Sequence, residues 1–71
     1  LPVLRIRKDA VKKALSGSPI FTSFLEQDQE KIIKKLNKGD KLCIFSDEIF
    51  IGCYNYIGAD NLVAKPEFVF N

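Results

Sequence analysis

The sequence contains no histidine, tryptophan or methionine, and it has only two cysteines among its 71 residues. Without histidine, a hydrolase triad has no general base, and two cysteines alone cannot complete a zinc site. A phosphate-binding loop is missing too, because the nearest candidate, Ser16–Pro19, contains a single glycine. The adjacent carboxylates Asp47 and Glu48 fall in an expected turn, where solvation explains them. We therefore expect no catalytic residue, no metal and no cofactor.

Long apolar runs are also missing. The run around Ile49–Ile51 has the length of a strand, far below the roughly 18 residues that span a bilayer. The N-terminus lacks the apolar stretch of a signal peptide, and it begins with Leu-Pro rather than Met, which suggests a trimmed fragment. We expect a cytoplasmic protein without membrane contact. Cys43 and Cys53 lie in apolar segments, so two buried reduced thiols are the main interpretation and a disulfide is the alternative.

Charge is more informative by position than by its sum. The formal net charge is only +2, and 46% of the residues are hydrophobic, which is typical of a folded chain. The acids gather at Glu26–Glu30, Asp47–Glu48 and Asp60. Ten of the 11 basic residues precede residue 42: Arg5, Arg7, Lys8, Lys12, Lys13, Lys31, Lys34, Lys35, Lys38 and Lys41. This separation favours a basic face for a polyanion, with a solvated lysine surface as the alternative.

The first twenty residues predict a strand followed by a short helix. Apolar and basic residues alternate over Val3–Arg7, as in a strand with one buried face. Asp9 is a candidate N-cap for a helix over Ala10–Leu15, with Lys12 and Lys13 opposite its apolar side. Gly17 is placed to end the helix in the left-handed conformation.

Residues 22–38 predict an amphipathic helix. The preceding Ile20–Phe21 can form a second strand or anchor a loop. Ser23 and Glu26 have the spacing of a capping box, and Asp28 is a rival helix start. The segment Asn37–Asp40 is expected to end the helix. The apolar stripe of this expected helix consists of Leu25, Ile32, Ile33 and Leu36.

From residue 41 the hydrophobic period changes to that of strands. Gly52 lies inside one of them, where a glycine often marks a bulge or a barrel corner. Many short strands in so few residues favour a small closed or half-closed barrel, in an α+β domain. The expected order is a strand Lys41–Ser46, a turn Asp47–Glu48, a strand Ile49–Ile57, a turn Gly58–Asn61, and short strands Leu62–Ala64 and Glu67–Phe70 separated by Lys65-Pro66.

Two blocks of the sequence resemble the C-terminal RNA-binding domain of bacterial tRNA pseudouridine synthases of the TruB family. The first runs from Leu1-Pro2-x-Leu4 to Ala14-Leu15-x-Gly17-x-Pro19-Ile20. The second comprises Leu42–Phe45, Ile49–Gly52 and the closing string Leu62-x-x-Lys65-Pro66-x-x-Val69-Phe70. Two departures are the longer segment Thr22–Lys38 and Cys43, which stands where a polar or basic residue is common. The family's catalytic aspartate motif is absent and would lie upstream.

The resemblance implies one PUA-like domain over residues 1–71, a mixed-β pseudo-barrel with two helices, in which residues 22–38 are an atypical helical insertion. It implies binding to tRNA, next to an upstream catalytic domain that isomerises a T-arm uridine to pseudouridine without a cofactor. We expect a monomer. By position, the expected RNA-binding residues are Lys12, Lys13, Gly17, Ser18, Lys65 and, more weakly, Lys41.

Two other hypotheses stay open. One is a PUA-like domain of another RNA-modifying protein. The other is a small protein-interaction or regulatory domain without nucleic-acid binding, whose docking surface is the stripe around Ile32, Ile33 and Leu36. Packing of that stripe on the domain's own barrel is the simpler interpretation.

Overall fold

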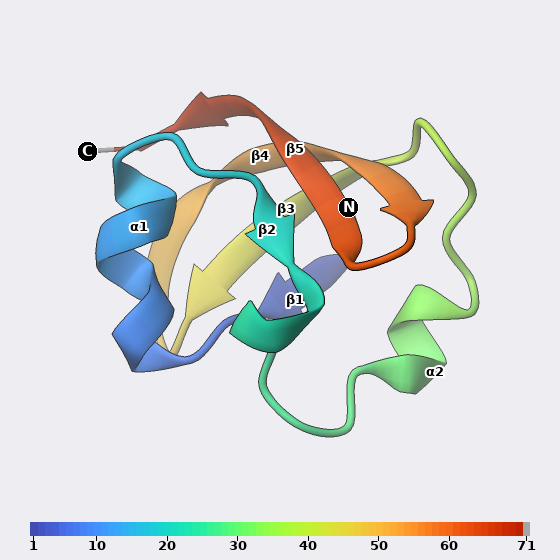
Figure 1. Ribbon diagram of the computed structural model, residues 1–71, viewed down its shortest axis with the longest axis horizontal. Coiled ribbons are helices and arrows are strands. Elements are labelled where there is room, and N and C mark those ends of the chain that lie inside the picture. The colour runs from blue at the N-terminus through green and yellow to red at the C-terminus, as the bar shows by residue number, and fades with distance from the viewer. Residues whose placement is uncertain (71) are drawn as a thin grey trace.

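A curled mixed sheet of five strands forms the body of the protein in the computed structural model, which describes residues 1–70 (Figure 1). The strands lie in the order β1-β3-β4-β5-β2; the β1–β3 pair is parallel and the other three pairs are antiparallel. The expected α+β class is confirmed. The strands are β1 (Val3–Arg5), β2 (Ile20–Phe21), β3 (Lys41–Ser46), β4 (Ile49–Ala59) and β5 (Leu62–Val69).

The two outer edges of the sheet meet, so that it curls into a half-barrel. Just beyond β1, Ile6 forms an antiparallel bridge with Leu25, which follows β2 closely in the chain. The N–H of Arg7 donates to the carbonyl of Phe24 at 2.8 Å. Pairing of the outer strands removes exposed edges that could otherwise recruit another chain. The curled sheet is therefore consistent with the small pseudo-barrel that the strand pattern predicts.

The core fills the inside of this curl. Strand β3 shows the expected period of two, because Leu42, Ile44 and Ser46 are buried while the residues between them are not. Every strand contributes, and α1 (Val11–Leu15) adds Ala14 from one side. The completely buried apolar residues are Leu4, Ile6, Ala14, Ile20, Leu42, Ile44, Ile51, Tyr54 and Ala64.

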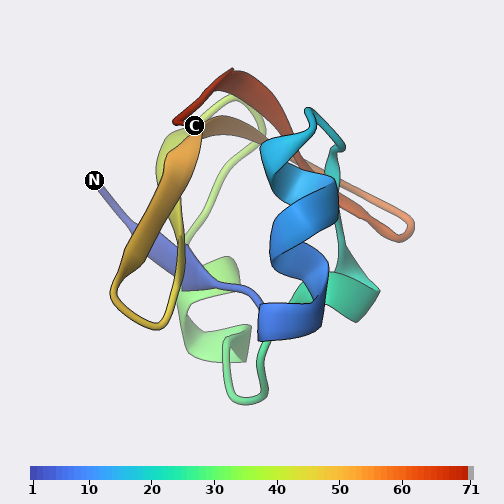
Figure 2. The same ribbon diagram turned by 90° about the vertical axis from the view of Figure 1, so that its left-hand side faces the viewer.

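The first helix begins differently from the prediction. A 3-10 turn, η1 (Lys8–Ala10), leads into α1, and Asp9 lies within that turn instead of capping a helix. Its carboxylate lies 3.2 Å from Nε of Arg7, and neither η1 nor α1 has a side-chain cap. Figure 1 places α1 and the β3–β4 turn at the same, left-hand end of the molecule, and Figure 2, which views that end, shows the turn to the left of the helix. Within residues 1–70, neither helix has the length or apolar character that crossing a bilayer requires.

The expected long helix over residues 22–38 is wrong. The segment holds a 3-10 turn, η2 (Thr22–Phe24), and only four residues of α-helix, α2 (Glu30–Ile33). Ser23 and Glu26 form no capping box, because Leu25 between them is extended and pairs across the sheet edge. Asp28 has a φ of 64°, which interrupts any helix there. The pairing of the sheet edges thus overrides the local helical pattern, and residues 22–38 are not a helical insertion.

The apolar stripe nevertheless packs against the domain's own core, as the simpler interpretation predicts. Leu36 is buried, and Ile32 and Ile33 are half-buried against the core. The helix α2 ends at Ile33, before the expected Asn37–Asp40, where the N–H of Asn37 donates to the carboxylate of Asp40 at 2.8 Å in a turn. The stripe is therefore mainly a core element.

The second half of the chain follows the predicted hairpin with two differences. The turn at Asp47 is confirmed, but β4 runs on to Ala59. The two short final strands are one strand, β5, which continues through Pro66. Pro66 lies beside a register shift between β4 and β5, where the hydrogen-bond ladder is already irregular.

Gly52 marks a bulge, as predicted. The register between β3 and β4 shifts there, so that Ile51 is the extra residue of β4. A Cβ atom on Gly52 would meet the carbonyl oxygen of Phe68 and, at 3.0 Å, Cα of Val69. Only glycine lets β5 approach β4 so closely at this point.

Tyr54 places a hydroxyl group inside the core. The side chain is fully buried, and among residues 1–70 its oxygen has no hydrogen-bond partner. Burial disfavours the phenolate and raises the pKa of Tyr54 to about 12.

We expect Gly52→Ala to lower the free energy of unfolding by about 2 kcal/mol or more, because β4 and β5 must separate to admit the methyl group. Gly39→Ala is the matched control. Gly39 has a φ of +90° but open space around it, so its strain should cost about 1 kcal/mol. Urea unfolding of both variants measures the difference. Equal losses would contradict the close approach at Gly52.

The buried Tyr54 predicts a loss of stability in alkali. The unfolded chain ionises near a pKa of about 10, whereas the folded protein holds the proton up to about 12. Stability is therefore fully present below pH 10, and roughly 2 kcal/mol is lost as the pH rises through that window. Tyr54→Phe should remove this loss and, by deleting an unpaired hydroxyl, unfold at higher urea concentration at pH 7. Urea midpoints from pH 8 to 12 test both outcomes.

Candidate nucleic-acid interface

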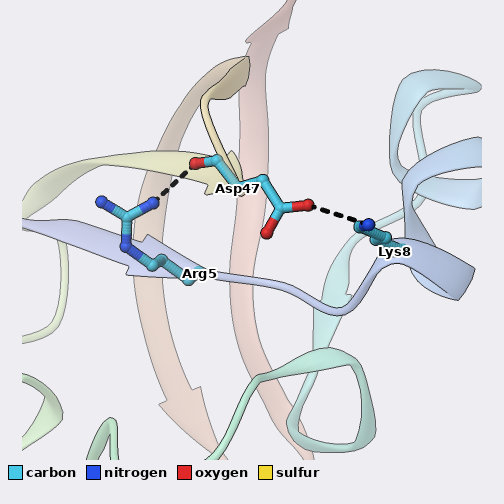
Figure 3. A network of polar contacts seen from close by, with 3 residues as sticks. All are labelled: Arg5, Lys8 and Asp47. Carbon is cyan, nitrogen blue, oxygen red and sulfur yellow. Dashed lines mark hydrogen bonds and ion pairs between the residues drawn. The ribbon is translucent and has the colours of Figure 1, made fainter.

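Several basic side chains already form hydrogen bonds or ion pairs with other residues of the protein. Figure 3 shows Asp47, in the β3–β4 turn, between two of them. A guanidinium nitrogen of Arg5 donates to the backbone carbonyl of Asp47 at 2.7 Å, and Nζ of Lys8 lies 3.4 Å from its carboxylate. These exposed contacts add little stability, but they hold the turn against the segment that follows β1. Arg5 and Lys8 are therefore not free cations.

Lys12 and Lys13 are the free lysines of the first helix. Both are exposed on α1, and among residues 1–70 neither has a carboxylate within 4.0 Å. Nζ of Lys13 lies 5.9 Å from the ring centroid of Phe24, a distance typical of a weak cation–π contact. The burial of Ala14 against the core fixes which side of this short helix faces solvent.

The turn after α1 is open to approach, but its N–H groups are occupied. Gly17 has a φ of +99° and ends the helix as predicted, and no atom lies within 4 Å of where its Cβ would be. The N–H of Gly17 donates to Ala14 at 3.0 Å, and that of Ser18 donates to Lys13 at 3.2 Å. These N–H groups are therefore not free to bind a phosphate. The helix carbonyls satisfy them first.

Lys65 continues this surface onto the sheet. Ile20 of β2 pairs with Ala64 of β5, so the connection through Gly17 and Ser18 enters the sheet beside Lys65. Lys65 is exposed, and no ion pair forms on it within residues 1–70. The fold thus brings the end of the turn after α1 beside β5, although the two segments are far apart in the sequence.

Lys41 lies on the same outer face, two strands away. Lys41 of β3 and Lys65 of β5 both pair with Asn55 of β4, which corresponds to a separation of about 10 Å between the two backbones. Unlike Lys65, Lys41 is engaged: its Nζ lies 2.8 Å from the carboxylate of Glu67. Asn55 was not predicted as a site residue, because its position opposite Lys41 depends on the bulge in β4.

We define the α1–β5 surface as Lys12, Lys13, Gly17, Ser18 and Lys65, with Lys41 at its margin. A second lysine group, on and after α2, lies at the opposite end of the molecule from α1 (Figure 1). Sequence reasoning did not select this group, although its close spacing was a visible signal. Its exposed members are Lys31, Lys34, Lys35 and Lys38.

Within the described part of the chain, no three histidine, cysteine or acidic residues gather where they could hold a metal ion. No model of a known protein family and no curated protein sequence matches the chain.

Proposed function

We propose that this domain binds structured RNA through the α1–β5 surface. The observation that carries the proposal is the open glycine turn that follows Lys12 and Lys13 of α1 and enters the sheet beside Lys65 of β5, with no ion pair on these lysines within residues 1–70. Lysines contact phosphates as point charges and release the counterions condensed on the nucleic acid. Double-stranded RNA is read mostly through its shape and its phosphate and 2′-hydroxyl groups, which suits such a surface.

The attraction comes from ammonium groups rather than from the backbone. The N–H groups of Gly17 and Ser18 are paired, and the Ser18 hydroxyl donates to the carbonyl of Pro19 at 2.8 Å. We expect the open space at Gly17 to let the sugar-phosphate backbone of the RNA come near Lys12, Lys13 and Lys65 without steric conflict. Binding of this kind is weak, depends on salt and has little sequence preference.

The RNA we propose is the stem of a tRNA, and the proposed parent protein is a tRNA pseudouridine synthase of the TruB type. The support for this finer proposal is the resemblance of the two sequence blocks, together with a fold that is consistent with a small pseudo-barrel. In such a protein this domain grips the stem. A separate domain then supplies the aspartate that attacks the flipped uridine.

A tRNA titration over several salt concentrations tests the proposal. Lys12→Ala/Lys13→Ala should weaken binding roughly tenfold and make the slope of log K against log salt shallower by about 1.5, because two phosphate contacts disappear. Lys31→Ala/Lys34→Ala removes the same charge from the opposite end of the molecule and should change the slope much less. Equal effects of the two variants would mean that net charge, and not the α1–β5 surface, drives binding.

The Lys41–Glu67 ion pair predicts a gain of affinity. Glu67→Gln removes an exposed negative charge from beside Lys41 and frees its ammonium group for a phosphate. We expect tRNA to bind a few-fold more tightly, and the salt slope to steepen by up to about 0.9. Glu30→Gln, on α2, makes the same charge change away from the surface. An effect as large in Glu30→Gln would contradict a role for Lys41.

A protein-interaction role is the second candidate, because one pocket lies beside α2. It has a volume of about 380 Å³ and a mostly apolar lining formed by Pro2, Val3, Ile32, Lys35, Leu36 and Asp40. The tRNA titration separates the two candidates. Absent or salt-insensitive binding of tRNA would favour the second.

A further inference from the structure

The two cysteines face each other across the β3–β4 hairpin. Cys43 pairs directly with Cys53, and both are free and half-buried rather than buried. Both point to the outer side of the sheet, because their neighbours Leu42, Ile44 and Tyr54 point inward and are fully buried. The two thiols therefore lie side by side on one face.

The bulge at Ile51 creates this alignment. Beside the turn, Ser46 pairs with Ile49, and a regular ladder would continue from there to place Cys43 opposite Gly52. The extra residue shifts the register by one, so that Cys53, and not Gly52, lies opposite Cys43.

The backbone hydrogen bonds show that Cys43 and Cys53 form a non-hydrogen-bonded pair, the kind in which the two Cα atoms lie closer together. The N–H of Cys43 donates to the carbonyl of Pro2 at 2.9 Å, away from β4. Because the N–H and C=O of one strand residue point to the same side, Cys43 and Cys53 exchange no backbone hydrogen bonds. In such non-hydrogen-bonded pairs the Cα atoms lie about 4.5 Å apart. That separation falls within the range of about 4.4–6.8 Å that a disulfide spans.

We propose that Cys43 and Cys53 are a redox site, which forms a reversible cross-strand disulfide by exchange with a low-molecular-weight disulfide. One cysteine thiolate attacks a sulfur of the small disulfide and forms a mixed disulfide, releasing one small thiol. The second cysteine, as thiolate, attacks the protein sulfur of that bond and releases the second small thiol. The two protein thiols are oxidised, each losing its proton, and the small disulfide is reduced to two thiols.

The surroundings favour completion of the second step. The chain already holds the resolving thiol opposite the mixed disulfide, so no backbone rearrangement is needed. Burial and the adjacent Cys43 raise the pKa of the Cys53 thiol; Glu67 acts in the same direction and Lys41 opposes it. Exchange should therefore become faster as the pH rises above 7, since the thiolate is the nucleophile.

The test is incubation of the 71-residue protein with oxidised and reduced glutathione at pH 8, followed by intact-mass and free-thiol measurements. We expect a monomer that has lost two hydrogens and both reactive thiols, and that regains them with excess reductant. Its thermal unfolding midpoint should rise by roughly 10 °C, because the crosslink restricts the unfolded chain. Cys43→Ser and Cys53→Ser should instead stop at the glutathione adduct and show no such rise.

Three results would overturn the proposal. The thiols could both stay free at a fully oxidising glutathione ratio, the protein could accumulate a stable adduct like the single variants, or it could form intermolecular dimers. The proposal does not rest on RNA binding, since none of these measurements involves RNA.

Discussion

The pairing of the two sheet edges is the constraint on which the rest of the structure depends. The bridge between Ile6 and Leu25, with the 2.8 Å hydrogen bond from Arg7 to Phe24, joins the segments that leave the outermost strands. Without it a five-stranded sheet of this size would keep two open edges. The bridge also requires Leu25 to be extended, and this limits helix formation in residues 22–38 to the four residues of α2.

A second constraint is the bulge of β4, which decides what the outer face carries. One extra residue, with glycine next to it, bends the strand and moves every later residue of β4 by one place against β3. As a result Cys53 lies opposite Cys43, and Asn55 lies between Lys41 and Lys65. The proposed redox site and the margin of the proposed RNA surface thus both follow from a single irregularity in the hairpin.

The basic side chains of this domain differ in whether they form ion pairs or hydrogen bonds with the rest of the protein. Arg5, Arg7 and Lys8 are held by nearby carboxylates or carbonyls around α1 and the β3–β4 turn. Within residues 1–70, Lys12, Lys13 and Lys65 form no ion pair, and neither do the lysines of the second group on and after α2. A lysine that is already paired must lose that interaction before it can neutralise a phosphate. The cations of the proposed α1–β5 surface, apart from Lys41 at its margin, are lysines without such a partner in the described residues.

Local patterns in the sequence were sufficient for the features that depend on near neighbours. The change of hydrophobic period predicted β3, Asp47 marked the hairpin turn, and Gly17 marked the end of α1, because each is decided by backbone conformation within a few residues. The lack of histidine likewise excluded a hydrolase triad with a histidine base, and the single glycine of Ser16–Pro19 excluded a phosphate-binding loop there.

Only the tertiary structure decided what depends on distant segments. The stripe from Leu25 to Leu36 has a helical period, yet Leu25 pairs with Ile6 as a strand, because the hydrogen bonds gained across the sheet outweigh local propensity. The N–H groups after Gly17 proved to be occupied, and a register shift placed Cys43 beside Cys53. Sequence patterns therefore determined where the hairpin strands and several turns form, while long-range pairing determined which side chains meet on the surface.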